Sequence, residues 1–134
     1  MVSKNFRKIC YIYHDKKGVS SARNAGIRIS KSNWISFLDS DDEWMKDKLL
    51  LQKEYILKNP NVKFLHTNEI WLKNGQHLNQ KKIHKKYGGH IFKNCLKLCC
   101  ISPSSTMIKK KLFDKIGYFD ESFEVCEDYE FWLR

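Results

Sequence analysis

The sequence WISFLDSDDEW, residues 34–44, decides the fold, because a short apolar run breaks abruptly into a cluster of acids. Ile35 and Phe37 suit a buried strand, and a continuous apolar run of this length favours a parallel sheet covered on both faces. Asp39 and Asp41 then fall just beyond the carboxyl end of that strand. Because open α/β sheets bind their ligands in the crevice at this end of the strands, the stretch predicts a ligand site.

Two interpretations of the acid cluster stay open on spacing alone. Closely spaced carboxylates repel one another, and a hard cation such as Mg2+ or Mn2+, held by one or two carboxylates and substrate phosphates, relieves that repulsion. Alternatively, Asp41, Asp42 and Glu43 cap the helix that follows, since helix N-termini favour acidic residues. A lone D-x-D pattern does not distinguish the two and needs structural context.

Length, charge and cysteine content limit the class of protein. The 134 residues suffice for one domain with a real core, and the formal net charge of +10 suits nucleic acid, an anionic membrane or a phosphorylated ligand. The basic stretch at 81–86 interleaves no aromatic stacking platform, so we predict no nucleic-acid binding. An odd count of five cysteines favours reduced thiols and a cytoplasmic location, and no apolar run reaches the length of a membrane span.

The order of the predicted elements indicates an α/β fold. Residues 7–13 alternate like a strand, residues 20–30 place apolar residues at helical spacing after a serine cap, and residues 35–38 form the next strand. This β-α-β order builds a parallel sheet by a right-handed crossover. Farther on, the sequence predicts a helix at 45–59 with an apolar stripe, helices at 90–100, 110–116 and from 127, strands at 62–66, 69–72 and 105–108, and an Asn-Gly hairpin turn at 73–76.

Four motifs follow one another along the chain: GVSSARNAGI at 18–27, FLDSDDEW at 37–44, SPSSTMI at 102–108 with GYFDE at 117–121, and EDYEFWLR at 127–134. They resemble, in the same order, the G-x-x-x-A-R-N-x-G, F-L-D-x-D-D-x-W, P-S-S-x-M-I … G-x-F-D-E and E-D-x-x-x-W-x-R motifs of the family 2 glycosyltransferases. The resemblance covers about residues 10–134. It implies an α/β, GT-A (Rossmann-like) fold with a mostly parallel sheet flanked by helices.

The same resemblance implies a partial domain over residues 1–134. Members of the family begin with a strand ending in P-x-Y-N and a second ending in D-D-G-S, which hold the nucleotide base, and neither segment occurs here. Their chains also continue beyond the E-D motif. A sheet without its first strands leaves an exposed edge that favours self-pairing, so we expect homodimers through that edge.

The resemblance assigns the donor and metal residues. Asp41 matches the metal ligand of the D-x-D motif, and Asp39 lies near the ribose or reaches the metal through water, with Mn2+ or Mg2+ as the ion. Arg23 contacts the base or the phosphates of the donor; an arginine on a solvated helix face is the competing interpretation. The metal neutralises charge developing on the nucleoside-diphosphate leaving group.

The resemblance also assigns the acceptor side. Asp128 is the candidate general base that takes the proton of the acceptor hydroxyl, and Glu127 beside it raises the pKa of one of the two carboxyls. The alternative is that both acids only decorate a helix N-terminus. Ser104 and Ser105 line the acceptor site by resemblance, although hydrogen bonds at the start of a strand explain them equally well.

Together these residues predict a metal-dependent, inverting transfer of a sugar from a nucleotide-sugar donor to the hydroxyl of a saccharide or lipid-linked acceptor. Enzymes of this family in bacteria commonly build surface polysaccharide. The lysine-rich charge suits a peripheral position at the anionic inner face of the membrane. The competing hypothesis is a non-catalytic binding or scaffold remnant that keeps the acidic motifs without a nucleotide-base site.

Overall fold

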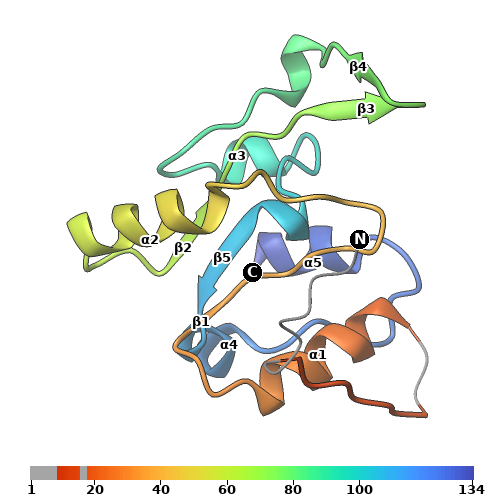
Figure 1. Ribbon diagram of the computed structural model, residues 1–134, viewed down its shortest axis with the longest axis vertical. Coiled ribbons are helices and arrows are strands. Elements are labelled where there is room, and N and C mark those ends of the chain that lie inside the picture. The colour runs from red at the N-terminus through yellow and green to blue at the C-terminus, as the bar shows by residue number, and fades with distance from the viewer. Residues whose placement is uncertain (1–8, 16–17) are drawn as a thin grey trace.

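The computed structural model describes residues 9–15 and 18–134, which form an α/β arrangement of short strands and helices (Figure 1). Residues 9–13 form no strand and their side chains are largely exposed, so the strand predicted at 7–13 is wrong there; residues 7 and 8 lie outside the described part. The elements are α1 (Val19–Ile29), β1 (Trp34–Ile35), α2 (Lys48–Lys58), β2 (Phe64–His66), β3 (Trp71–Lys73), β4 (Gln76–Leu78), the 3-10 turn η1 (Lys82–His84), α3 (Phe92–Cys95), the 3-10 turn η2 (Pro103–Ser105), β5 (Thr106–Lys109), α4 (Lys111–Ile116) and α5 (Glu127–Leu133).

The central sheet has the strand order β1-β5-β2, and both pairings are antiparallel. Ile35 of β1 lies opposite Ile108 of β5, and Leu65 of β2 lies opposite Met107. The α/β class is therefore confirmed, but the strand pairs of the described residues differ from the expected parallel sheet. The physical reason is that β5 returns from a long excursion and inserts between β1 and β2, which run in the same direction as each other.

One aromatic core joins this sheet to three helices. Buried residues of α1, β1, β5, α4 and α5 form it, with Phe37 and Phe119 from the connecting segments. Phe119 stacks on Phe131 at 4.4 Å between ring centroids and meets Phe37 edge-to-face at 5.5 Å. Such ring pairs contribute roughly 0.5–1.5 kcal/mol each beyond their area burial. The core therefore fixes α1 and α5, which carry candidate site residues, against the same sheet.

The helix predicted at 90–100 is shorter than expected. α3 ends at Cys95, and the chain then turns so that Cys100 and Ile101 pack with Cys95 in a second, smaller cluster. Burying these residues on both sides of the turn stabilises the turn over a continued helix, which would carry Cys100 away from Cys95.

Helix α2 buries polar side chains and exposes apolar ones, which is the reverse of what the sequence predicts. Its buried residues are Lys48 and Gln52, whereas leucines of the predicted apolar stripe are exposed. The amide of Gln52 donates a hydrogen bond to the carbonyl of Ser105 at 3.1 Å and accepts one from Lys48 at 3.0 Å. The buried face is polar because it completes the hydrogen bonding of η2. Burial lowers the pKa of Lys48 to about 8.

The hairpin β3–β4 confirms the predicted turn. Asn74 and Gly75 have φ angles of 53° and 75°, the positive values that a type I′ turn requires. In Figure 1 this hairpin lies at the top of the view, at the end of the molecule opposite α1 and α4. None of the helices in the described part of the chain is long and apolar enough to cross a bilayer.

Gly117 ends α4 and gives a test of this packing. Its φ is +90°, and a Cβ there would lie 2.9 Å from Nη1 of Arg134. We expect Gly117→Ala to lower the free energy of unfolding by at least about 1–2 kcal/mol, because an L-residue is strained in the left-handed region. Gly26→Ala in α1 is the control, since nothing lies within 4 Å of its Cβ; it should stabilise by about 0.5–1 kcal/mol. Urea unfolding measures both, and equal effects would contradict the packing described.

Candidate active site

Arg23 joins three of the sequence motifs. It projects from α1, and its guanidinium donates to Oδ1 of Asp39 at 2.8 Å and to Oε1 of Glu127 at 2.6 Å. The side chains of Arg23 and Glu127 are only 9% and 11% exposed. Its planar fork of donors suits two carboxylates at once. The D-x-D segment and the E-D segment, 88 residues apart, are therefore held to one helix by one side chain.

Asn24, the next residue, fixes the GYFDE segment to the same helix. Its amide donates to the carbonyl of Phe119 at 2.8 Å, and its carbonyl oxygen accepts from the Phe119 N–H at 3.0 Å. The side-chain amide also donates to Glu121 at 2.8 Å. Because Asn24 is almost fully buried, these bonds satisfy polar groups that would otherwise be costly. Sequence reasoning missed this role, although a polar residue in the middle of a helical apolar pattern was a signal for it.

The turn that follows β1 presents the aspartates. The Asp42 N–H donates to the carbonyl of Asp39 at 3.1 Å, which closes a four-residue turn and leaves the side chains of Asp41 and Asp42 exposed. The Asp39 N–H donates to Oγ of Ser104 at 2.9 Å, and Nε1 of Trp44 donates to the Ser104 carbonyl at 2.9 Å. Ser104 thus ties both ends of the acidic turn to η2.

Ser104 and Ser105 are both buried. The hydroxyl of Ser105 donates to the carbonyl of Ser102 at 2.8 Å, while Oγ of Ser104 accepts from Asp39. The structure therefore gives both serines a positioning role beside the acidic turn. That they line the acceptor site stays a prediction.

Asp128 lies next to this cluster at the start of α5. It is half-buried, and burial raises the pKa of its carboxyl above the ordinary value. The charge of Glu127 raises the pKa of Asp128 further, while the N–H of Tyr129 and the charge of Arg23 lower it. The thiol of Cys99 lies 4.0 Å from Oδ2 of Asp128. A partly buried carboxyl whose pKa is raised by its surroundings and by a neighbouring acid is what we expect of a general base.

A metal ion fits the acidic turn only together with a ligand. Within the described residues no group of three or more His, Cys, Asp or Glu side chains is placed to hold a metal ion by itself. Asp41 is exposed, and Asp39 keeps Oδ2 free because Arg23 contacts only Oδ1. Mg2+ and Mn2+ are commonly held by one or two carboxylates with the rest of the shell from water and substrate phosphates, so this donor set suits them.

A cleft of about 530 Å³ lies between α1 and the segment 34–40. Arg23 and Asp39 line it, together with Ser36 and Ser40. Among the described residues, Ser36 Oγ and Arg23 Nε are buried and have no hydrogen-bond partner. Such groups are costly unless a ligand or water satisfies them. Both residues line the cleft, although these two atoms are themselves buried from solvent. Ser36 was a residue that sequence reasoning missed despite its place between apolar neighbours.

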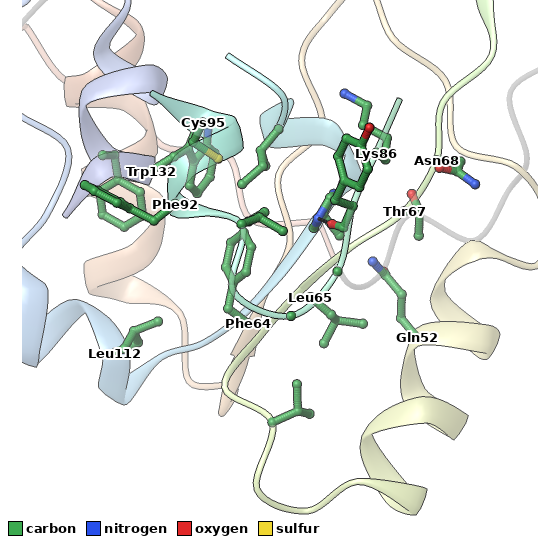
Figure 2. A pocket seen from close by; sticks show the side chains of 18 of the residues that line it. Gln52, Phe64, Leu65, Thr67, Asn68, Lys86, Phe92, Cys95, Leu112 and Trp132 are labelled. Carbon is green, nitrogen blue, oxygen red and sulfur yellow. Dashed lines mark hydrogen bonds between the residues drawn. The ribbon is translucent and has the colours of Figure 1, made fainter. Parts of the chain in front are cut away.

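A larger cavity of about 1070 Å³ lies elsewhere, between α2, β2, the segment 86–95 and α5. Figure 2 shows Phe64, Phe92 and Trp132 on one side of it and Lys86 and Asn68 on the other. None of the residues predicted for the metal, the donor, the acceptor or the general base lines this cavity. Its size alone does not make it the active site.

The chain belongs to glycosyl transferase family 2, whose sequence profile matches residues 1–117. This membership confirms the GT-A fold class. The match ends before α5, so Glu127 and Asp128 are placed with the family's motifs by geometry and by the E-D resemblance. No solved structure matches the chain significantly.

Curated relatives are longer glycosyltransferases. The chain is 30% identical to an uncharacterised glycosyltransferase of Rickettsia felis over 98% of this chain and 22% of the relative. It is 30% identical to the UDP-Glc:alpha-D-GlcNAc-diphosphoundecaprenol beta-1,3-glucosyltransferase of Escherichia coli, over 87% of this chain and 44% of that protein. A glycosyltransferase of Methanocaldococcus jannaschii is 28% identical over 96% of this chain and 44% of its own length. The chain thus spans less than half of each of these relatives.

The Arg23 pairs predict a large stability effect. We expect Arg23→Gln to lower the free energy of unfolding by about 3–5 kcal/mol, because it leaves the nearly buried Glu127 and the partly exposed Asp39 without a cation. Arg28→Gln, one turn farther along α1, is the control: its guanidinium is 56% exposed and 3.8 Å from Glu121, so it should cost below about 1 kcal/mol. Urea unfolding at low salt measures both. Similar losses for the two variants would contradict the central place of Arg23.

The raised pKa of Asp128 predicts a pH-dependent stability. A carboxyl whose folded pKa is raised contributes stability only below its unfolded pKa, about 3.9, and loses it as pH rises through the folded value. Asp128→Asn should therefore melt a few degrees above the natural chain at pH 7, and the difference should shrink toward pH 4. Asp114→Asn, at an exposed position of α4, should change little at either pH. A variant that is less stable at pH 7 would refute the raised pKa.

Proposed function

We propose that this chain carries the donor-binding and proton-accepting groups of a glycosyltransferase that moves a sugar from a nucleotide sugar to an acceptor hydroxyl. The observation that supports this most is the pair of Arg23 contacts, which tie Asp39 of the D-x-D turn and Glu127 of the E-D pair to one helix. Arg23 and Asp39 also line the cleft beside α1. Family membership makes sugar transfer the expected chemistry. The relatives' greater length makes the activity of the whole protein part of the proposal.

On the donor side, Asp41 and Oδ2 of Asp39 would hold Mn2+ or Mg2+ together with the diphosphate of the nucleotide sugar. An ion bound there would supply Lewis-acid neutralisation of the charge that develops on the leaving diphosphate. Arg23 orients Asp39 through its contact with Oδ1. Arg23 and Ser36 line the cleft beside Asp39 and are the polar residues that lie near the donor in this proposal.

On the acceptor side, Asp128 takes the proton of the attacking hydroxyl while the diphosphate leaves from the opposite face of the sugar. This arrangement inverts the anomeric centre. The raised pKa of Asp128 brings its basicity closer to that needed near neutral pH. Glu127 is engaged by Arg23, so its role is to position the arginine and to add negative charge beside Asp128, whereas Asp128 is the base.

The acceptor we propose is a lipid-linked saccharide, in the synthesis of a bacterial surface polysaccharide. The name of the Escherichia coli relative includes a diphosphoundecaprenol-linked sugar as the acceptor. In this proposal Ser104 and Ser105 line the acceptor site; both are buried, and Ser104 binds the Asp39 N–H of the acidic turn.

Thermal melting with Mn2+ and each of UDP, GDP, CDP and dTDP tests the donor site. A ligand that binds only the folded state adds about 2.7 kcal/mol at a hundredfold excess over its dissociation constant. We expect a shift that needs both the metal and one nucleotide, and that Asp41→Asn abolishes. Asp114→Asn on α4 is the matched control and should keep the shift.

The opposite result has a definite meaning. If the chain melts cooperatively and no nucleotide shifts the transition, the donor-site proposal fails for this chain. The non-catalytic remnant is then the better description, with the acidic motifs retained for their structural contacts. Sugar transfer by a longer protein that contains this chain would in turn exclude the hypothesis of a non-catalytic remnant.

A further inference from the structure

The net positive charge of this protein arises from one stretch of the sequence. Residues 70–113 contain ten lysines and no aspartate or glutamate, whereas the other residues carry fifteen basic and fifteen acidic side chains. The net charge of +10 therefore resides entirely in that stretch. Such segregation creates a local positive field that an evenly spread charge would not.

The outermost part of this stretch is the hairpin arm, residues 70–87, which contains β3, β4 and η1. Three large apolar side chains on it are more than half exposed: Ile70 at 60%, Leu72 at 66% and Ile83 at 64%. Between them, four lysines are exposed and have no acidic partner within salt-bridge distance among the described residues: Lys73, Lys81, Lys82 and Lys85.

Glu69 fixes the base of the hairpin arm. Its carboxylate accepts hydrogen bonds from Ser102 at 2.6 Å and Trp71 at 3.1 Å, and pairs with Lys86 at 2.9 Å. These contacts lower the pKa of Glu69 despite its partial burial, so it stays ionised. The Trp71 ring also packs on His84 at 4.8 Å, which holds η1 against the hairpin. Glu69 is therefore already paired where the hairpin arm joins the rest of the protein, and it does not neutralise the lysines farther along the arm.

We propose that the hairpin arm docks on an anionic phospholipid surface, with its exposed aliphatic side chains in the interfacial region and its lysines at the level of the lipid phosphates. Interfacial segments bind by this combination of apolar burial and attraction to anionic headgroups. Lysine suits such a site because its apolar stem can enter the interface while its ammonium stays among the phosphates.

A nucleic-acid partner fits the hairpin arm less well. Binding of single strands relies on exposed aromatic faces for base stacking. Here the Trp71 ring is packed on His84, and Lys85 lies over the Tyr87 ring at 5.4 Å. The three apolar side chains of the arm that are more than half exposed, Ile70, Leu72 and Ile83, are aliphatic instead, which favours the lipid surface.

Docking by the hairpin arm deepens the proposed function, because it would hold the protein at the surface where a lipid-linked acceptor resides. Only that link to the acceptor rests on the proposed function. Binding to vesicles needs neither nucleotide nor transfer, so failure of the donor site and failure of docking give separate results.

The test is sedimentation of the natural chain with phosphatidylcholine vesicles that contain about one third phosphatidylglycerol, at low salt. Each lysine near an anionic surface contributes about fivefold in binding, so removing four should weaken it at least a hundredfold. The arm variant changes the exposed lysines of the hairpin arm: Lys73→Gln, Lys81→Gln, Lys82→Gln and Lys85→Gln. A matched control removes the same charge from exposed positions outside 70–113: Lys31→Gln, Lys46→Gln, Lys53→Gln and Lys58→Gln.

We expect the arm variant to lose vesicle binding and the control to stay within a few-fold of the natural chain. Leu72→Ser with Ile83→Ser keeps every charge and should still weaken binding about tenfold or more, because apolar burial is lost. Circular dichroism establishes that each variant is folded. Equal loss in the arm variant and the control, equal binding to pure phosphatidylcholine, or displacement of the vesicles by single-stranded RNA at lower concentration would each overturn the proposal.

Discussion

The candidate site depends on one buried cation. Arg23 separates two carboxylates, Asp39 and Glu127, that would otherwise face each other unpaired at the edge of the aromatic core. A lysine could not replace it, because one ammonium cannot present the planar fork that two separate carboxylates accept from a guanidinium. Since Asp39 ends the segment after β1 and Glu127 begins α5, the position of both elements relative to α1 is tied to this side chain. The Phe119 ring beneath the guanidinium, 5.4 Å from it, adds a further favourable contact.

A second network explains why the acidic turn has a fixed shape. Oγ and the carbonyl of Ser104 bind Asp39 and Trp44, so both ends of the turn are attached to η2. The carbonyl of Ser105 is in turn satisfied by Gln52 of α2. Buried carbonyls need donors, and α2 supplies one by turning its polar side inward. The leucines of α2 are exposed because the polar side of the helix faces inward. Gln52 on that inward side supports both the packing of α2 and the position of η2 next to the acidic turn.

The sequence predicted what is local and missed what is distant. The helix at 20–30 follows from apolar periodicity and the Asn74-Gly75 turn from the backbone freedom of two adjacent residues, so both were predicted. The serine cap expected for that helix is wrong, because α1 begins at Val19 with Gly18 as its N-cap and without a side-chain capping hydrogen bond. The antiparallel insertion of β5 was not, because pairing of Ile108 with Ile35 joins segments more than seventy residues apart and leaves no local signal. The buried polar face of α2 was missed for the same reason: only the presence of the Ser105 carbonyl makes Gln52 a better inward residue than a leucine. Arg23, Asp39 and Glu127 were each singled out by motif, but the contacts of Arg23 with the two carboxylates were not predicted.

The two acids of the E-D pair have different tasks for an electrostatic reason. A base at Asp128 needs a raised pKa, yet a guanidinium nearby lowers that pKa by favouring the carboxylate. Glu127 resolves the conflict, because it forms the short contact with Arg23 and its negative charge offsets the cation as seen from Asp128. Arg23 can then hold Asp39 without lowering the pKa of Asp128 as far as an unpaired guanidinium would. The proposed role of Asp128 as the base is therefore compatible with a nearby arginine, because the negative charge of Glu127 offsets the positive charge of the guanidinium.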